Sequence, residues 1–127
     1  MELYKNYING EFVNSKSGKT FKTIDPAKEE EFASITEAEE FEVNVAVESA
    51  FNAFHGEWSK MLPKHRANYL RLIGDQLLEN AELLGKIETI NTGKIFKETK
   101  FQANYIAEFY YYYAGLADKI EGATLPI

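Results

Sequence analysis

The stretch Tyr105–Lys119 reads YIAEFYYYYAGLADK, and it decides how the rest of the chain is interpreted. Four rings and a leucine recur at the i, i+4, i+7, i+8 and i+11 spacing of one helix face: Tyr105, Phe109, Tyr112, Tyr113 and Leu116. Exposed ring area is unfavourable by roughly 25 cal/mol per Å². The stretch therefore predicts a helix with protein on more than one side. An ordinary core helix whose tyrosine hydroxyls reach solvent accounts for the same pattern.

Length and charge narrow the function classes. The 127 residues, 45% of them hydrophobic, suffice for one domain and are too few for two ordinary ones, so we expect residues 1–127 to form a single unit. A net charge of -6 argues against partnership with nucleic acid or a membrane surface. No apolar run approaches the ~20 residues of a membrane-spanning helix. We therefore expect a cytoplasmic protein.

The residues that carry most enzyme chemistry are absent. The chain has no cysteine, which excludes disulfides, thiolate metal sites and a cysteine nucleophile within it. Its eight glycines never reach the spacing of a dinucleotide or phosphate loop. His55 and His65 have no evident ligand partner, and solvated or capping roles account for both. No catalytic, metal or cofactor site follows from these residue types.

A β hairpin and two further short strands are predicted first. In Tyr7–Val13, Asn9-Gly10 stands between apolar segments, and both residues accept the positive φ of a type I′ turn. Residues 20–24 alternate with the period of a half-buried strand, which Pro26 ends because it lacks an N–H donor. Residues 32–35 predict another short strand.

About four helices are predicted after the strands. The first carries an apolar face of Val43, Val47, Ala50, Phe51 and Phe54. It begins between Thr36 and Glu39, either with a capping box formed by these two residues or with Glu39 as the capping residue. A break at residues 55–59 ends it.

The remaining helix boundaries follow from single residues. Pro63 fits the first turn of the second helix, where a backbone N–H has no hydrogen-bond acceptor within the helix. The Asn80 side chain is expected to accept hydrogen bonds from the first free amides of the third helix. Gly93 predicts a left-handed end to that helix. The aromatic helix begins after Ile95 and runs toward Asp118, and residues 122–127 form an extended tail.

Several segments, in this order, resemble the N-terminal part of the NAD(P)-dependent aldehyde dehydrogenase superfamily. The Tyr7–Phe12 hairpin is similar to its opening hairpin, and residues 23–27 (TIDPA) to its NPA turn, with Asp25 in place of the usual asparagine. Residues 88–94 (ETINTGK) resemble its ETLDxGK segment, and residues 112–122 (YYAGLADKIEG) its YYAGxADKIxG segment. With matches in the first two helices, the similarity covers essentially the whole chain.

This resemblance implies an α/β fragment. An N-terminal β hairpin and short strands would precede the helices, and the central Rossmann-like sheet of the family would be missing. Residues 1–127 would form the N-terminal segment of the cofactor-binding and oligomerisation region. The full-length enzymes oxidise an aldehyde to a carboxylic acid with NAD or NADP. Their nucleophilic cysteine, glutamate base and cofactor loop belong to later segments, so we expect this chain alone to be inactive and to bind no cofactor.

Two sets of site residues are implied by the resemblance. Some family members hold a monovalent cation with backbone oxygens matching Thr23 and Ile24 and with an aspartate that matches Asn91. Because asparagine keeps an oxygen but loses the charge, a role for Asn91 in ending its helix is an alternative. In the family the aromatic helix also borders the substrate channel, which makes Tyr105, Ile106 and Phe109 candidate wall residues; core packing is the alternative for all three.

Three interpretations of the whole chain stay open at this point. The first is the N-terminal fragment of an aldehyde-oxidising oxidoreductase, whose partner is the remainder of that polypeptide. The second is a self-sufficient helical interaction module that binds a partner protein through its tyrosines. The third is a fragment that associates with intact subunits of a related enzyme. The ring distribution predicts self-association of the isolated chain.

Overall fold

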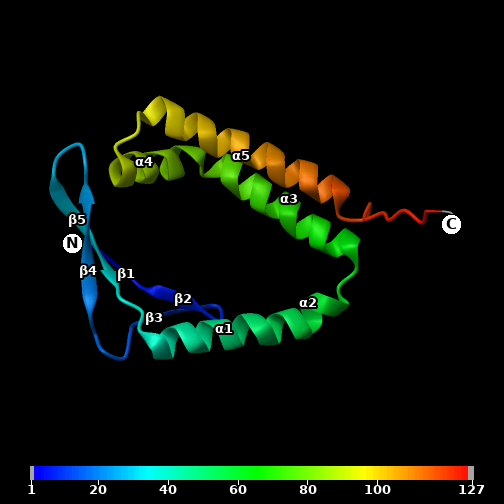
Figure 1. The fold of residues 1–127 in the computed structure, drawn as a ribbon. Coiled ribbons are helices and arrows are strands. Elements are labelled where there is room, and N and C mark those ends of the chain that lie inside the picture. The colour runs from blue at the N-terminus through cyan, green and yellow to red at the C-terminus, as the bar shows by residue number, and fades with distance from the viewer. Residues whose placement is uncertain (1, 126–127) are drawn as a thin grey trace. The chain divides into compact units, whose positions relative to one another are not determined.

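The computed structural model describes residues 2–125, whose contacts divide them into two compact units (Figure 1). Unit 1 comprises the described residues up to Lys60 together with Ile90–Gly93, and unit 2 comprises Met61–Thr89 and the described residues from Lys94 onward. Each unit has its own packing. The expectation of a single unit stays a prediction.

Unit 1 contains all the strands found among the described residues. They are β1 (Glu2–Tyr4), β2 (Asn6–Ile8), β3 (Glu11–Val13), β4 (Thr20–Asp25) and β5 (Glu30–Thr36). One sheet has the order β1-β5-β4, with β1 parallel and β4 antiparallel to β5. The second is the β2–β3 hairpin, where φ values of 52° at Asn9 and 85° at Gly10 confirm the predicted type I′ turn.

The β4–β5 ladder contains an irregularity that matters for the site. Thr23 pairs with Ala33 and Ile24 pairs with Glu31, which leaves Phe32 as an extra residue in β5. A bulge of this kind disrupts the ladder locally and leaves backbone groups beside it free for other partners. It lies next to the carbonyl groups of Thr23 and Ile24.

Helix α1 (Glu40–His55) begins at one of the two predicted places. Thr36 ends β5, whereas Glu39 caps α1 and forms a capping box with Glu42. The Glu42 carboxylate also accepts the Lys16 N–H at 2.9 Å and the Ser15 hydroxyl at 3.5 Å. The Glu42 carboxylate accepts hydrogen bonds from the backbone N–H groups of Lys16 and Glu39, and these two bonds hold the pKa of Glu42 below its ordinary value. The charged carboxylate thus fastens the loop before β4 to the start of α1.

Helix α2 (Glu57–Lys60) is a single turn that follows α1 directly, where only a break was expected. The apolar face predicted for α1 is not buried within the described residues. Val43, Val47, Phe51 and Phe54 are between 51% and 64% exposed. The periodicity therefore predicted the helix correctly, but it did not show which segment would bury the apolar face of that helix.

Unit 2 is built from α3 (Pro63–Glu79), α4 (Ala81–Thr92, whose last turn belongs to unit 1) and α5 (Phe96–Leu116). Pro63 occupies the first turn of α3, and Gly93 ends α4 with a φ of +74°, as predicted. Asn80 behaves differently from the prediction. Its side-chain amide donates to the Gln76 carbonyl at 2.9 Å and so caps the end of α3, while its backbone carbonyl accepts the Leu84 N–H at the start of α4.

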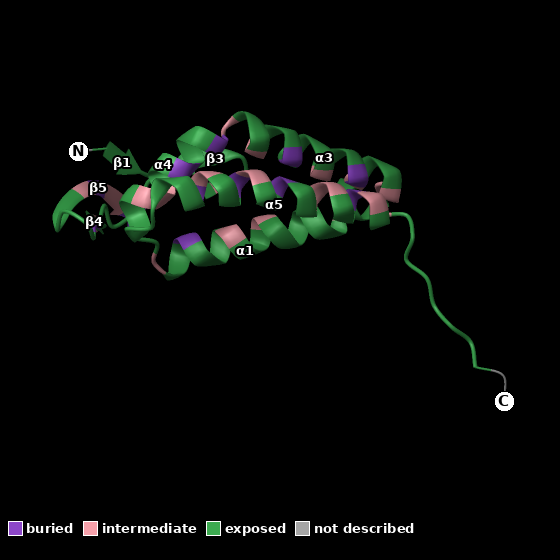
Figure 2. Cartoon of the chain, turned by 90° about the horizontal axis from the view of Figure 1, so that it is seen from above, coloured by how far each residue is buried: buried purple, intermediate pink, exposed green. Residues whose placement is uncertain are grey.

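Small residues form the buried face of α5, as the purple positions in Figure 2 show. These residues are Thr99, Ala103, Ala107 and Ala114. The ring stripe that predicted the helix lies on the opposite side, with Tyr112 64% exposed and Tyr113 58% exposed. The alternative of a core helix that buries this stripe against the chain itself is wrong within the described residues, whereas exposed rings are what the fragment interpretation expects. Small side chains on the buried face let α5 approach the neighbouring helices closely.

The close approach is visible at two glycines. A Cβ on Gly74 of α3 would lie 2.8 Å from the Tyr111 ring of α5, whose hydroxyl donates to Asp75 at 2.7 Å. This hydrogen bond raises the pKa of Tyr111. A Cβ on Gly85 of α4 would lie 2.8 Å from the Lys100 nitrogen of α5. Glycine is therefore required at Gly85, where the overlap is with backbone atoms, whereas a side chain at Gly74 would have to displace the Tyr111 ring.

Candidate functional site

A polar corner in unit 1 brings two of the predicted site residues together. The Thr23 hydroxyl on β4 donates to the Asn91 side-chain oxygen in the last turn of α4 at 3.1 Å. Ile24 is the next residue of β4 and its side chain is 53% exposed. The two backbone carbonyl groups and the Asn91 amide oxygen thus come from adjacent residues of β4 and from the last turn of a helix.

Asn91 has a structural role that neither sequence interpretation included. Helix α4 continues one residue past it to Thr92, and Gly93 supplies the left-handed end. The Asn91 side chain instead ties the end of α4 to β4 through Thr23. Pro26 packs against the same segment, since a Cβ on Gly93 would lie 3.0 Å from its ring. Asn91 therefore joins two segments that are distant in sequence.

The predicted channel residues lie on the exposed side of α5. Tyr105 is 54%, Ile106 43% and Phe109 47% exposed. The rings of Tyr105 and Phe109 meet edge to face with centroids 5.1 Å apart. Together with Glu108, Tyr112 and Tyr113 they line a shallow apolar groove. The structure brings Tyr105 and Phe109 together, and no element of unit 2 within the described residues covers them.

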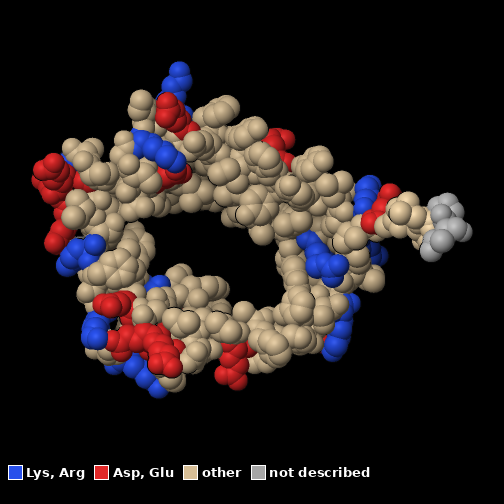
Figure 3. Space-filling view, in the orientation of Figure 1, with Lys and Arg blue, Asp and Glu red and all other residues tan. Residues whose placement is uncertain are grey.

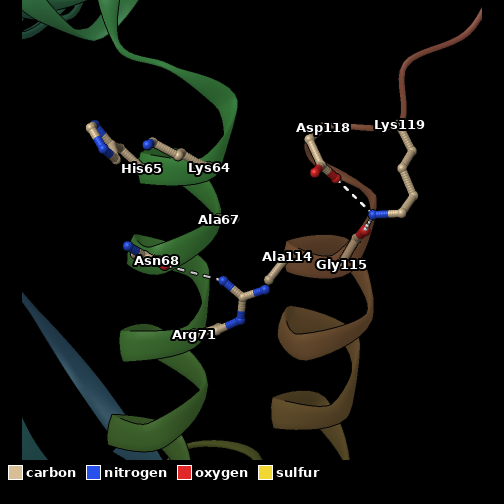
Figure 4. A pocket seen from close by; sticks show the side chains of 9 residues that line it. All are labelled: Lys64, His65, Ala67, Asn68, Arg71, Ala114, Gly115, Asp118 and Lys119. Atoms are coloured by element: carbon tan, nitrogen blue, oxygen red, sulfur yellow. Dashed lines mark hydrogen bonds and ion pairs between the residues drawn. The ribbon is translucent and has the colours of Figure 1, made fainter.

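A polar pocket lies between the start of α3 and the end of α5 (Figure 4). Its volume is about 370 Å³, and its lining includes Lys64, His65, Asn68, Arg71, Asp118 and Lys119. Arg71 donates to Asn68 at 3.2 Å, and the Lys119 ammonium donates to Asp118 and to the Gly115 carbonyl, both at 2.7 Å. The Lys119 hydrogen bond holds the pKa of Asp118 below its ordinary value. Each of these charges is thus partly satisfied inside the pocket.

The pocket was not predicted from the sequence. Lys64, Asn68 and Arg71 follow the i, i+4, i+7 spacing of one helix face, and that was the available signal. The sequence did not show which residues face them: Asp118 and Lys119 lie just after the end of α5. All of the polar residues named are surface side chains, and none is a nucleophile paired with a base.

The described residues provide no catalytic constellation. The His55 Nδ1 lies 2.9 Å from the Phe51 carbonyl, and the two rings contact each other at a tilt of 36°, which is a local structural role. Within residues 2–125, no group of three His, Cys, Asp or Glu side chains is placed to hold a metal ion. The sequence also contains no glycine-rich phosphate loop. A search of residues 2–125 finds no helix with the length and hydropathy needed to span a membrane.

Comparison with known proteins identifies the family to which this chain is similar. Residues 12–127 match the Aldehyde dehydrogenase family. Aldehyde dehydrogenase 1 of Tanacetum cinerariifolium is 45% identical over 98% of this chain, and the alignment covers 26% of the relative. A hydroxybutyrolactone dehydrogenase of Acinetobacter baylyi is 41% identical over the whole chain, which again covers 26% of the relative.

Solved structures give the same result. The NAD+ complex of an aldehyde dehydrogenase from Bacillus cereus superposes with a TM-score of 0.91 at 38% identity, over 98% of this chain and 26% of that protein. Betaine aldehyde dehydrogenase from Staphylococcus aureus superposes with a TM-score of 0.90 at 34% identity, over 98% of this chain and 26% of that protein. The chain thus spans about a quarter of the length of the relatives it matches. It belongs to the aldehyde dehydrogenase family, and it corresponds to the N-terminal portion of that family's fold.

Proposed function

We propose that this chain is the N-terminal segment of an NAD(P)-dependent enzyme that oxidises an aldehyde to a carboxylic acid, and that the segment alone does not catalyse the reaction. The observation that carries the proposal is a family match over residues 12–127 in a chain without a single cysteine. Thiohemiacetal formation needs a nucleophile that these residues do not contain. The enzyme's chemistry would therefore reside in the remainder of the polypeptide.

The segment would serve as a scaffold for that remainder, as part of the cofactor-binding and oligomerisation region. Beyond the α5 groove, an apolar groove of α3 and α4 supports this role, because its lining is nearly all hydrophobic: Tyr69, Leu72, Ile73, Leu77, Leu83 and Leu84. Apolar surfaces of this kind normally become protein contacts. NAD or NADP would be bound by the remainder. On the face that Figure 3 shows, the Lys and Arg side chains form small separate groups, and the net charge of -6 argues against nucleic acid as a partner.

The aldehyde itself is not assigned by this segment. Two relatives of similar identity, 45% and 41%, carry names that differ in substrate: one is a general aldehyde dehydrogenase and the other acts on a substituted hydroxybutyrolactone. Within the segment, Tyr105, Ile106 and Phe109 are our proposed channel-wall residues. Their edge-to-face rings and exposed aliphatic side chain suit an apolar wall.

An activity assay with complementation tests the proposal. The purified 127-residue chain, mixed with NAD+ or NADP+ and a panel of aldehydes, is expected to give no NAD(P)H absorbance at 340 nm above the buffer rate. Coexpression with the Bacillus cereus enzyme lacking its matching quarter is expected to restore turnover, because the two folds superpose with a TM-score of 0.91.

The matched control is the same truncated enzyme expressed without this chain, which is expected to be inactive. Turnover by the 127-residue chain alone would contradict the assignment of chemistry to later segments. Failure of complementation, with both pieces soluble, would favour a self-sufficient interaction module or a fragment that joins intact subunits.

We further propose that the polar corner of Thr23, Ile24 and Asn91 is a weak monovalent-cation site. The two carbonyl groups beside the β5 bulge and the Asn91 oxygen are neutral oxygen donors, which hard cations accept. The donor set has no formal charge. Binding is therefore expected to be weak in this chain.

Substituting Asn91→Asp is expected to strengthen cation binding. The added carboxylate retains the hydrogen bond from Thr23 and supplies a negative charge, so Na+ or K+ should stabilise the variant by about 1 kcal/mol more than choline at equal ionic strength. Thermal unfolding read from Trp58 fluorescence in unit 1 measures this difference. Asn14→Asp adds the same charge elsewhere in unit 1 and is expected to show no ion preference. Equal unfolding midpoints in the Na+, K+ and choline salts for both variants would contradict a cation site at this position.

A further inference from the structure

The turn of the β2–β3 hairpin contains a chemically reactive pair, Asn9-Gly10. The backbone nitrogen of the residue after an asparagine is a nucleophile that can close a five-membered ring on the side-chain amide carbon. Glycine favours this step because it has no Cβ to hinder the ring and leaves the backbone free to rotate. No other asparagine in the sequence is followed by glycine. Asn9 is therefore the residue of this chain at which ring closure is chemically easiest.

The closed turn opposes this reaction. Asn9 has a φ of 52° and Gly10 a φ of 85°, and in a type I′ turn the first of these residues has a ψ of about +30°. At this ψ the Gly10 nitrogen and the Asn9 side chain lie on opposite sides of the Asn9 Cα–C bond, whereas the ring needs them on the same side. Rotation about this bond disrupts the pairing of Ile8 with Glu11. The turn must therefore open before the ring can form.

A hydrogen bond from α1 holds the turn closed. The hairpin sheet has only two strands, and a two-stranded hairpin is marginally stable by itself. The hydroxyl of the half-buried Ser49 on α1 donates to the Asn9 side-chain oxygen at 3.2 Å. This bond restrains the same amide group that would react. Asn9, Gly10 and Ser49 all belong to unit 1 and meet within one chain, whatever the remaining polypeptide covers.

We propose that Asn9 is a site of spontaneous deamidation and that the Ser49 hydrogen bond controls its rate. When the turn opens, the Gly10 nitrogen loses its proton to hydroxide and forms a bond to the Asn9 Cγ. The Cγ–Nδ2 bond then breaks, and this nitrogen takes up a proton from water and leaves as ammonia. Water adds to either carbonyl of the resulting succinimide and opens it to aspartate or isoaspartate. The net change is hydrolysis of one amide.

The two products affect the hairpin differently. Aspartate keeps an oxygen for the Ser49 hydroxyl and adds a negative charge at the turn. Isoaspartate inserts an extra carbon atom into the backbone, and a two-residue type I′ turn has no place for it. The isoaspartate form should therefore lose the Ile8–Glu11 pairing and the tie to α1. Unit 1 would loosen at this hairpin as the protein ages.

Peptide mapping by mass spectrometry tests the site during incubation of the 127-residue chain in mildly alkaline buffer. The expected result is the mass increase for replacement of NH2 by OH at Asn9, as a mixture of aspartate and isoaspartate. Asn14, which is exposed and followed by Ser15, is the internal reference and should keep its amide over the same time. In guanidinium chloride, where the turn is always open, Asn9 should react about tenfold faster or more.

Substitution at Ser49 tests the control of the rate. Ser49→Ala should speed deamidation of the native chain about fivefold, because the turn loses a hydrogen bond of ordinary net strength. Ser49→Thr keeps a hydroxyl and should react at nearly the native rate. The matched control is Ser59→Ala, which removes a hydroxyl bonded to the Gly56 carbonyl elsewhere in unit 1 and should leave the rate at Asn9 unchanged.

The outcomes separate the site from its control, and neither depends on dehydrogenase activity. An Asn9 amide that reacts no faster than Asn14 in the native chain would overturn the deamidation site. Equal native-state rates for Ser49→Ala and the unsubstituted chain would overturn the role of Ser49. So would a Ser49→Ala effect that persists in guanidinium chloride, because the hydrogen bond is absent from the unfolded chain.

Discussion

Replacing Gly85 with valine is expected to destabilise unit 2 by about 3 kcal/mol, the upper range for overpacking a close contact. A Cβ at this position would lie 2.8 Å from the Lys100 nitrogen and 2.9 Å from its Cα. Both are backbone atoms of α5, so no side-chain rotation relieves the overlap. Helices α4 and α5 must separate instead. The loss should appear in the hydrogen exchange of α5 amides, while Trp58 fluorescence in unit 1 should keep its unfolding midpoint.

The control is a glycine substitution that is expected to raise the free energy of unfolding. A Cβ on Gly115 in the last turns of α5 meets no heavy atom within 4 Å among the described residues. Gly115→Ala is therefore expected to stabilise the helix by about 0.5–1 kcal/mol through helix propensity. If Gly85→Val were tolerated as well as Gly115→Ala, the close approach of α4 and α5 would be incorrect.

Thr99→Val is expected to cost about 1–3 kcal/mol, the penalty for leaving a buried polar group without its partner. Thr99 is fully buried, and its hydroxyl donates to the Gly85 carbonyl at 2.9 Å and contacts the Thr89 hydroxyl at 2.8 Å. Valine has nearly the same shape but satisfies neither group. Urea unfolding monitored by α5 hydrogen exchange measures the change.

Two further variants separate hydrogen bonding from packing at this position. Thr99→Ser keeps the hydroxyl and loses one methyl group, so it should recover most of the lost stability. In a double-mutant cycle, Thr89→Ala should cost less in the valine background than in the native one, because their hydroxyl contact is already absent. Equal stability of the serine and valine variants would mean that the hydroxyl contributes nothing.

Local features of the fold were predictable because single residues determine them. Asn9-Gly10 has the backbone freedom that a type I′ turn needs, Pro63 suits a first helical turn, and Gly93 suits a left-handed helix end. Strand β1 was missed because its three residues are all exposed and pair only with the distant β5. Its position depends on a long-range contact, which no local pattern of the chain reports.

The face of α5 that packs within this chain was not predicted, for a physical reason. The rings have the strongest hydrophobic signal, but the buried residues of α5 are the small side chains Thr99, Ala103, Ala107 and Ala114, which let the helices of unit 2 approach closely. Their spacing, with Thr99, was the signal of the true packing face. The candidate site was predictable in part. Resemblance pointed to Thr23 and Asn91, but their hydrogen bond needed the fold.

Unit 1 is made from two separate stretches of the sequence, so cutting the chain between Lys60 and Met61 separates parts of the same unit. A piece ending at Lys60 would lack Ile90–Gly93, and with them the Asn91 contact to Thr23 and the Gly93 contact to Pro26. A piece starting at Met61 would carry that last turn of α4 without its strand neighbours. No single proteolytic nick releases unit 1 with all of its native contacts, so a piece ending at Lys60 should be digested faster than the same residues in the intact chain.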